Sequence, residues 1–200
     1  MIRTAFFDMG NVLTFFSHER MCQQVAEVCD SDATEIARIF FETTLETDFE
    51  CGRVSKQQFH QRFEEELGHS VDFERLEHAG SDIFRLNEEI LPVLDELKSR
   101  GIRLIVLSNT NASHVDFIRA EFDLLHRFDD YVFSHEAGAM KPDAAIYDVA
   151  LSKANCEANE CFYTDDIEAY ILAAREFNIQ AEVFTDVATL KQHLTDRGAL

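Results

Sequence analysis

The chain has 200 residues, which is enough for one domain or for one core with a modest insertion. Its 38 acidic and 18 basic side chains give a formal charge of −20, a field that repels nucleic acid and anionic membranes, so we expect neither as a partner. A site for an anionic substrate on so acidic a chain needs a bound cation or a locally placed lysine.

The cysteines and the hydropathy pattern favour a cytoplasmic protein. Five cysteines, an odd number without a CxxC pair, indicate thiols that stay reduced and mostly structural. The N-terminus has no apolar stretch of signal-peptide length, and no run approaches the length of a membrane span.

The first predicted element is a strand that ends at a carboxylate. The apolar run in residues 4–7 stops at Asp8, and a turn containing Gly10 and Asn11 follows. A short apolar run bounded by turn residues is typical of a strand buried on both faces. In an open α/β sheet, ligands bind beyond the carboxyl ends of the strands, so Asp8 stands where chemistry is done. The alternative is an ordinary Asp that begins a turn.

From about residue 18 to residue 84 the pattern is purely helical, and we expect no strand after Leu13. Ser55 and Asp72 are predicted to begin helices, and Gly68 is predicted to end one. Gly52 suits the left-handed position of a tight turn. This stretch is too small for a comfortable core of its own, so we interpret residues 15–89 as a helical insertion packed on another body.

The second half of the chain alternates between strands and helices. Pro92 suits the first turn of a helix, and short apolar runs predict four further strands, at residues 102–107, 131–133, 161–163 and 180–184. Such alternation implies right-handed crossovers and a parallel sheet with helices on both faces. We therefore predict an α/β fold, a Rossmann-like parallel sheet built from residues 1–14 and 90–200.

Four predicted strands are followed by polar clusters, and each type of side chain there has a role in phosphoryl transfer. The clusters contain Asp8, Ser108 with Asn109, Lys141, and Asp165 with Asp166. A carboxylate can attack phosphorus to give an aspartyl-phosphate, and further carboxylates can hold Mg²⁺. A hydroxyl, backbone amides and one ammonium can then neutralise the phosphoryl oxygens.

Each of these residues also has an ordinary structural explanation. Lys141 could be a surface lysine before a helix, Ser108 could cap a loop, and Asp165 with Asp166 could favour the following helix N-terminus electrostatically. The occurrence of all four clusters in one chain favours the site.

These clusters resemble the four motifs of the haloacid dehalogenase (HAD) superfamily, over essentially the whole chain. Residues 8–12 (DMGNV) match its first motif, Ser108 the second, Lys141 with Pro142 and Asp143 the third, and Asp165 with Asp166 the fourth. The helical insertion resembles the superfamily's helical cap domain. The phrases LSNTN at residues 107–111 and FYTDD at residues 162–166 look closest to the glucose-1-phosphate phosphatase branch.

The resemblance implies a role for each matched residue. Asp8 would be the nucleophile and a metal ligand. The Gly10 carbonyl and Asp166 would complete the Mg²⁺ ligands of the protein, with Asp165 assisting. Phosphate would be bound by Ser108, the Asn109 amide and Lys141.

Gly10 departs from the pattern of the superfamily's phosphatases, which usually carry a second Asp two positions after the nucleophile as acid and base. The backbone carbonyl can still ligate Mg²⁺, but the proton donor, which typically contributes roughly 10²–10⁴-fold, is missing. A cap side chain such as His18 or Glu50 could supply the proton, the leaving group could need little help, as in a sugar 1-phosphate, or the protein could be a phosphate-binding relic. We favour the second explanation.

The leading hypothesis is a Mg²⁺-dependent phosphatase that acts on a small phosphorylated metabolite, such as a sugar 1-phosphate, through an aspartyl-phosphate. The first rival is a 2-haloacid dehalogenase, which would use Asp8 on carbon without a metal and would have no use for the pair Asp165 and Asp166. The second rival is a catalytically impaired phosphate-binding module, which Gly10 supports best.

Overall fold

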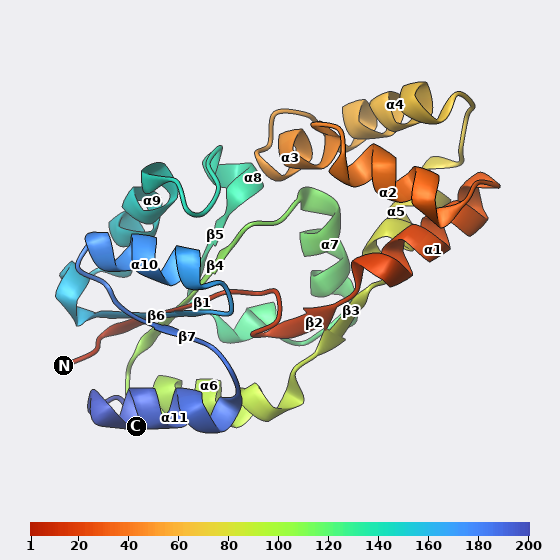
Figure 1. Cartoon of the computed structure of the whole chain (residues 1–200). Coiled ribbons are helices and arrows are strands. Elements are labelled where there is room, and N and C mark those ends of the chain that lie inside the picture. Colours follow the sequence, from red (N-terminus) through yellow and green to blue (C-terminus); the bar gives the residue numbers. More distant parts are fainter.

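The computed structural model describes all 200 residues and contains a five-stranded parallel sheet with the strand order β5-β4-β1-β6-β7 (Figure 1). Every neighbouring pair of strands runs parallel. The first strand in the sequence lies at the centre and is buried along its whole length. The α/β prediction is therefore confirmed, with strands at Thr4–Phe7 (β1), Arg103–Ser108 (β4), Asp130–Phe133 (β5), Cys161–Asp165 (β6) and Gln180–Val183 (β7).

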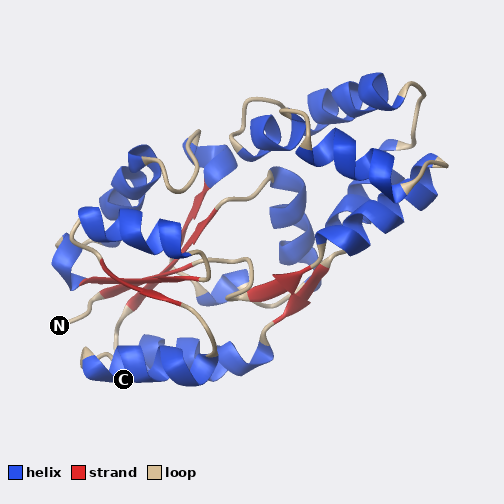
Figure 2. Ribbon diagram, viewed as in Figure 1, coloured by secondary structure: helices blue, strands red, loops and turns tan.

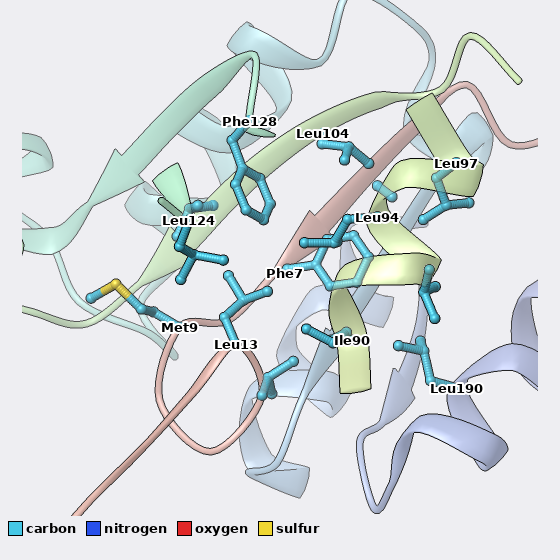
Figure 3. Packing of buried hydrophobic residues seen from close by; sticks show 14 of the residues in the cluster. Phe7, Met9, Leu13, Ile90, Leu94, Leu97, Leu104, Leu124, Phe128 and Leu190 are labelled. Carbon is cyan, nitrogen blue, oxygen red and sulfur yellow. The ribbon is translucent and has the colours of Figure 1, made fainter. Parts of the chain in front are cut away.

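Helices cover both faces of this sheet because successive strand residues point to opposite sides (Figure 2). Phe7 packs with residues of α6 (Leu91–Ser99), α7 (Ala112–Glu121) and α11 (Val187–Asp196). Figure 3 shows this cluster around the ring of Phe7, with side chains from α6 and β4 beside it. Phe6 faces the other way and packs with α9 (Ala144–Ala154) and α10 (Glu168–Glu176).

Short elements complete the connections around the sheet. They are the helix α8 (Ser134–Ala137) and three 3-10 turns, at Glu88–Ile90, Leu125–Arg127 and Ala158–Glu160. No helix combines the length and the apolar character needed to cross a membrane. All five cysteines are free thiols.

The remaining helices form a separate body to one side of the sheet (Figure 1). They share a hydrophobic cluster of their own, and they are α1 (His18–Cys29), α2 (Ala33–Phe41), α3 (Leu45–Glu50), α4 (Lys56–Leu67) and α5 (Phe73–Ser81). Ser55 begins α4 with a capping box to Gln58, and Gly68 ends it with φ of 88°. The division into a cap of residues 15–89 and a core of residues 1–14 and 90–200 stays a prediction, which this segregation of apolar contacts supports.

Two short strands join the helical body to the sheet, and here the sequence prediction was wrong. Thr14–Phe16 (β2) pairs antiparallel with Phe84–Leu86 (β3), with Phe16 opposite Phe84. We expected strand character to stop at Leu13 and helix to continue to Phe84, but α5 already ends at Ser81. Strands of three residues are too short to show an alternating pattern, and their pairing joins segments that are far apart in the sequence. The segment that enters the helical body and the segment that leaves it therefore lie side by side.

Candidate active site

The sheet topology brings the polar clusters together at one edge. Asp8 follows β1, Ser108 is the last residue of β4, and Asp165 is the last residue of β6. Because β1 lies between β4 and β6, these three residues end adjacent parallel strands. Lys141, from the loop between α8 and α9, reaches the same edge.

The Lys141 ammonium makes three hydrogen bonds in the site. Its Nζ donates to Asp8 Oδ1 at 2.7 Å, to Asp165 Oδ2 at 2.6 Å and to the Leu107 carbonyl at 3.1 Å. Burial alone lowers the pKa of Lys141, but the carboxylates of Asp8 and Asp165 outweigh it and raise that pKa above its ordinary value. Lys141 therefore carries a positive charge beside the proposed nucleophile at neutral pH.

Asn109 fixes the backbone of Lys141. The Lys141 amide donates to Asn109 Oδ1 at 2.7 Å, and Asn109 Nδ2 donates back to the Lys141 carbonyl at 3.0 Å. A side chain at the end of β4 thus holds the loop that carries the ammonium. Our sequence interpretation gave Asn109 a backbone role on phosphate, and this bridging role of its side chain was missed.

Three carboxylates converge beside the ammonium and could hold a metal ion. Asp8, Asp165 and Asp166 each offer an oxygen within 4.8 Å of the others. Burial raises the pKa of Asp8 to about 7; Lys141 opposes this rise, and Asp165 adds to it. A hard divalent cation suits oxygen ligands of this kind and would relieve their repulsion, so the donor set fits the Mg²⁺ that the sequence implies.

The two adjacent aspartates differ in how many of their oxygens the protein already uses. Asp165 is fully buried, and its Oδ2 accepts from Lys141 and from the Tyr163 hydroxyl while its Oδ1 accepts from the Ile167 amide at 2.8 Å. Asp166 is half-buried and accepts from Asn11 Nδ2 at 3.0 Å. Asp166 therefore has more lone pairs free for a metal, whereas Asp165 holds Lys141 in place.

Two residues that support the site were missed at the sequence level. Asn11 orients Asp166, and its φ of 54° marks the sharp turn after β1. Its position beside Gly10 indicates a turn, but nothing in the sequence indicates that its side chain contacts Asp166. Tyr163 lies within β6, where nothing in the sequence shows that its hydroxyl reaches Asp165.

A cavity of about 290 Å³ lies between the sheet edge and the helical body. Met9, Gly10, Ser108 and Asn109 line it from the sheet side. The helical body and the β2–β3 ribbon contribute aromatic rings, a histidine and two glutamates, namely Phe16, His18, Phe40, Phe41, Glu46, Glu50 and Phe84. The hydroxyl of Ser108 donates to the Asn109 carbonyl at 3.3 Å and lies beside this cavity, where the sequence predicts phosphate.

The ring of Phe16 leaves little room for a side chain at position 10. A Cβ at position 10 would lie 2.8 Å from Cε1 of Phe16. The Phe16 ring packs against His18, with centroids 5.0 Å apart, and against Phe84, with centroids 6.2 Å apart. The ring therefore fills the space that an acidic side chain at position 10 would need.

The fold and the site together define an α/β protein whose sheet edge carries carboxylates and a buried lysine beneath a helical body. Residues 2–178 match the family of haloacid dehalogenase-like hydrolases, and the chain belongs to that family. The superfamily resemblance predicted from the motifs is confirmed.

The similar proteins include both phosphatases and dehalogenases. A D-ribitol-5-phosphate phosphatase from Bacteroides thetaiotaomicron is 23% identical in an alignment of 203 positions that covers 98% of this chain and 98% of the relative. A HAD family enzyme from the same organism, solved with magnesium and inorganic phosphate, has a TM-score of 0.84 at 22% identity, covering 95% of this chain and 99% of its own. A 2-haloacid dehalogenase from Pseudomonas syringae has a TM-score of 0.72 at 17% identity, covering 98% and 100%. At these identities the two structures establish the fold; the glucose-1-phosphate branch stays a prediction.

Proposed function

We propose that this protein is a Mg²⁺-dependent phosphatase that hydrolyses a small phosphorylated metabolite through an aspartyl-phosphate on Asp8. The observation that carries the proposal is the pairing of Asp8 with the Lys141 ammonium beside two further carboxylates, next to a cavity lined by Gly10, Ser108 and Asn109. An ammonium at a nucleophilic carboxylate neutralises an incoming phosphoryl group, and the extra carboxylates suit a hard cation.

In the mechanism, Asp8 Oδ2, the oxygen that Lys141 does not bind, attacks phosphorus in line with the leaving group. The bond between phosphorus and the leaving oxygen breaks, and water later attacks the aspartyl-phosphate to release phosphate and restore Asp8. The Ser108 hydroxyl and the Asn109 amide bind the phosphoryl oxygens, and Lys141 binds one of them by exchanging one of its three hydrogen bonds within the protein. Asp8, Asp166 and the Gly10 carbonyl would hold Mg²⁺, whose charge offsets the repulsion between the nucleophile and the phosphate. The helical body excludes bulk water.

The chemistry of the cavity supports a substrate with a single charged group. No lysine or arginine lines it, and its polar side chains from the helical body include Thr43, Thr47, Glu46 and Glu50. A second phosphate or a carboxylate on the substrate would enter a cavity that has no lysine or arginine to neutralise it. We therefore propose a sugar or polyol monophosphate, with a sugar 1-phosphate as the narrower hypothesis; the relative named for D-ribitol 5-phosphate belongs to the same chemical class.

The dehalogenase is the rival that the family itself raises, because a 2-haloacid dehalogenase shares the fold. Its chemistry needs no metal, and so gives no reason for Asp166 to keep free lone pairs beside Asp8 and Asp165. The non-catalytic phosphate-binding module stays the third candidate.

A screen of phosphorylated metabolites with and without Mg²⁺ tests the function. We expect Mg²⁺-dependent phosphate release that EDTA abolishes, and a loss of at least about 10⁴-fold in kcat for Asp8→Asn, because the nucleophile is removed. Halide release from 2-chloropropionate that survives EDTA would establish the dehalogenase instead. Beryllium fluoride that binds with Mg²⁺, in a protein that releases no phosphate from any substrate, would establish the binding module.

A further inference from the structure

The site lacks the usual acid of this kind of reaction. An alcohol leaving group needs a proton as its bond to phosphorus breaks, and a positioned acid supplies typically about 10²–10⁴-fold. Position 10 cannot supply it, since Gly10 has no side chain and the Phe16 ring occupies the adjoining space. The proton donor therefore has to come from another residue that lines the cavity.

Four titratable side chains of the helical body and its neighbours line the cavity, namely His18, Glu46, Glu50 and His114. His114 is committed to other partners, because its Nε2 lies 3.3 Å from the Gly80 carbonyl and its Nδ1 lies 3.3 Å from Asn111 Nδ2. This arrangement suits a neutral ring whose one proton is on Nε2, which donates to the Gly80 carbonyl, while Nδ1 accepts from Asn111 Nδ2. Burial lowers the pKa of His114 to about 4, so it carries no second proton near neutral pH.

His18 and Glu46 are also held by their neighbours. The His18 ring packs between Phe16 and Phe41, with centroids 5.0 Å from each, and burial lowers its pKa. Glu46 accepts a hydrogen bond from Asn111 Nδ2 at 3.1 Å, on the α7 side of the cavity. Glu50 differs from Glu46 because its carboxyl has no hydrogen-bond partner within the protein, and it differs from His18 because it is not packed between two aromatic rings.

Glu50 lines the cavity next to a close contact between the two bodies. It is the last residue of α3, which lies beside α8 (Figure 1). Two residues later, Gly52 adopts φ of 66°, and a Cβ there would lie only 2.0 Å from the His135 carbonyl oxygen of α8. The turn that follows α3 therefore packs directly against α8 of the sheet domain. Glu50 lines the same cavity as Ser108 and Asn109, and the Lys141 ammonium is near enough to lower its pKa.

We propose that Glu50 replaces the absent second aspartate as the general acid and base of the reaction. The inference rests on the proposed phosphatase function. In the first step Asp8 attacks phosphorus, the electron pair of the breaking bond moves to the leaving oxygen, and that oxygen takes the proton of the Glu50 carboxyl. In the second step the Glu50 carboxylate takes a proton from water as its oxygen attacks the aspartyl-phosphate, and the electron pair returns to Asp8. Each turnover restores both side chains.

The surroundings of Glu50 suit both halves of this cycle. Burial raises the pKa of Glu50 to about 7, and the Lys141 ammonium opposes that rise. Glu46, the other charged group on α3 that faces it, has a pKa raised to about 8 by burial and by Glu50 itself. The Cys51 thiol also feels the charge of Glu50. An acid that titrates near neutral pH can both give and take a proton at that pH.

The test compares leaving groups in Glu50→Gln. The wild-type protein with Mg²⁺ is assayed on 4-nitrophenyl phosphate, whose leaving group needs no proton, and on alkyl phosphates such as D-ribitol 5-phosphate. We expect Glu50→Gln to lower kcat for the alkyl phosphate by about 10²-fold or more and kcat for the nitrophenyl ester less than about tenfold. The fall of alkyl kcat/KM above about pH 7, which reports the loss of the acid proton, should also disappear. Glu46→Gln, one helical turn away on the same cavity, should leave the ratio of the two rates unchanged.

Equal losses on both substrates, or a Glu50→Gln variant that keeps its alkyl phosphatase activity, would overturn the role of Glu50 and leave the proposed function standing. A wild-type protein that hydrolyses the nitrophenyl ester and no alkyl phosphate would also overturn it. A wild-type protein without Mg²⁺-dependent activity on either ester would overturn the proposed function itself. Circular dichroism of each variant verifies that it is folded.

Discussion

Lys141 is the residue on which the sheet edge depends most. Its side chain is almost inaccessible, and it joins Asp8 at the end of β1 to Asp165 at the end of β6. Removal of one partner from a buried ion pair typically costs about 3–5 kcal/mol, because an uncompensated charge stays buried. The same ammonium thus stabilises the folded chain and prepares the nucleophile.

We predict that Lys141→Met lowers the free energy of unfolding by about 3 kcal/mol, measured by urea denaturation in the presence of EDTA. Lys153→Met is the matched control, since Lys153 pairs with Asp130 at 3.1 Å where both side chains are about one third exposed. That substitution should cost about 1 kcal/mol or less. Equal losses in the two variants would contradict a special role for the buried pair.

His114 gives a prediction about acid stability. Burial lowers its pKa to about 4 in the folded protein, whereas an unfolded histidine titrates near pH 6.5. Between these values the unfolded chain binds the extra proton, so the stability that the neutral ring allows is present above pH 6.5 and is lost as the pH falls toward 4. In His114→Phe the decrease in unfolding free energy from pH 7 to pH 4.5 should be smaller by roughly 2 kcal/mol. Parallel urea titrations of both proteins across this range measure the difference, and identical slopes would contradict it.

At the scale of elements, α3 and the turn after it form one contact between the two bodies, and α5 with α7 forms another. The chain passes between the bodies only through β2 and β3, which pair with each other. The close approach of Gly52 to α8 holds the α3 end of the helical body against the sheet domain. A side chain at position 52 would separate the elements that enclose the cavity.

We predict that Gly52→Ala lowers kcat/KM by at least about tenfold, because the added methyl group displaces Glu50 and opens the cavity to water. Gly68→Ala is the control, since Gly68 also has a positive φ, of 88°, but nothing lies within 4 Å of its added Cβ. That variant should lose roughly 1–2 kcal/mol of stability and keep its activity. Steady-state kinetics with thermal unfolding separates the two effects, and full activity of Gly52→Ala would exclude this role of the contact between Gly52 and α8.

For the whole molecule, the sequence predicts the sheet better than the joins between its parts. Runs such as residues 102–107 are local signals, so the alternating strands and their parallel direction were predicted correctly. The ribbon of β2 and β3 was missed because the pairing of Phe16 with Phe84 is a contact between distant segments.

The candidate site divides in the same way. The types of residue at the sheet edge follow from the motif spacing, which predicted Asp8, Lys141 and Asp165 together. The division of labour between Asp165 and Asp166 does not, because it depends on which side chain reaches Tyr163, Lys141 or Asn11. Such hydrogen bonds depend on rotamers and on packing, and no local sequence pattern records these.

The overall charge of −20 predicts how substrate binding responds to salt. An acidic molecule repels phosphorylated substrates at long range, and salt screens that repulsion over a Debye length of about 10 Å at 0.1 M. At fixed free Mg²⁺, kcat/KM should therefore rise as NaCl increases from low values to about 0.1 M. The increase should be larger for a sugar bisphosphate than for a monophosphate. Stopped-flow or steady-state measurements at each salt concentration test this, and a decrease with salt would show that local cations dominate.

The contact between Phe16 and Gly10 restricts the mutational routes open to this lineage. One nucleotide change can turn a glycine codon into an aspartate codon, yet the new carboxylate would collide with a ring held by His18 and Phe84. The ring has to move or shrink to admit a side chain at position 10, so we expect the two positions to be epistatic. A homologue with the common aspartate at position 10 should carry a small residue at position 16. In such a homologue the residue at position 50 should vary, because the aspartate would supply the proton that we propose for Glu50.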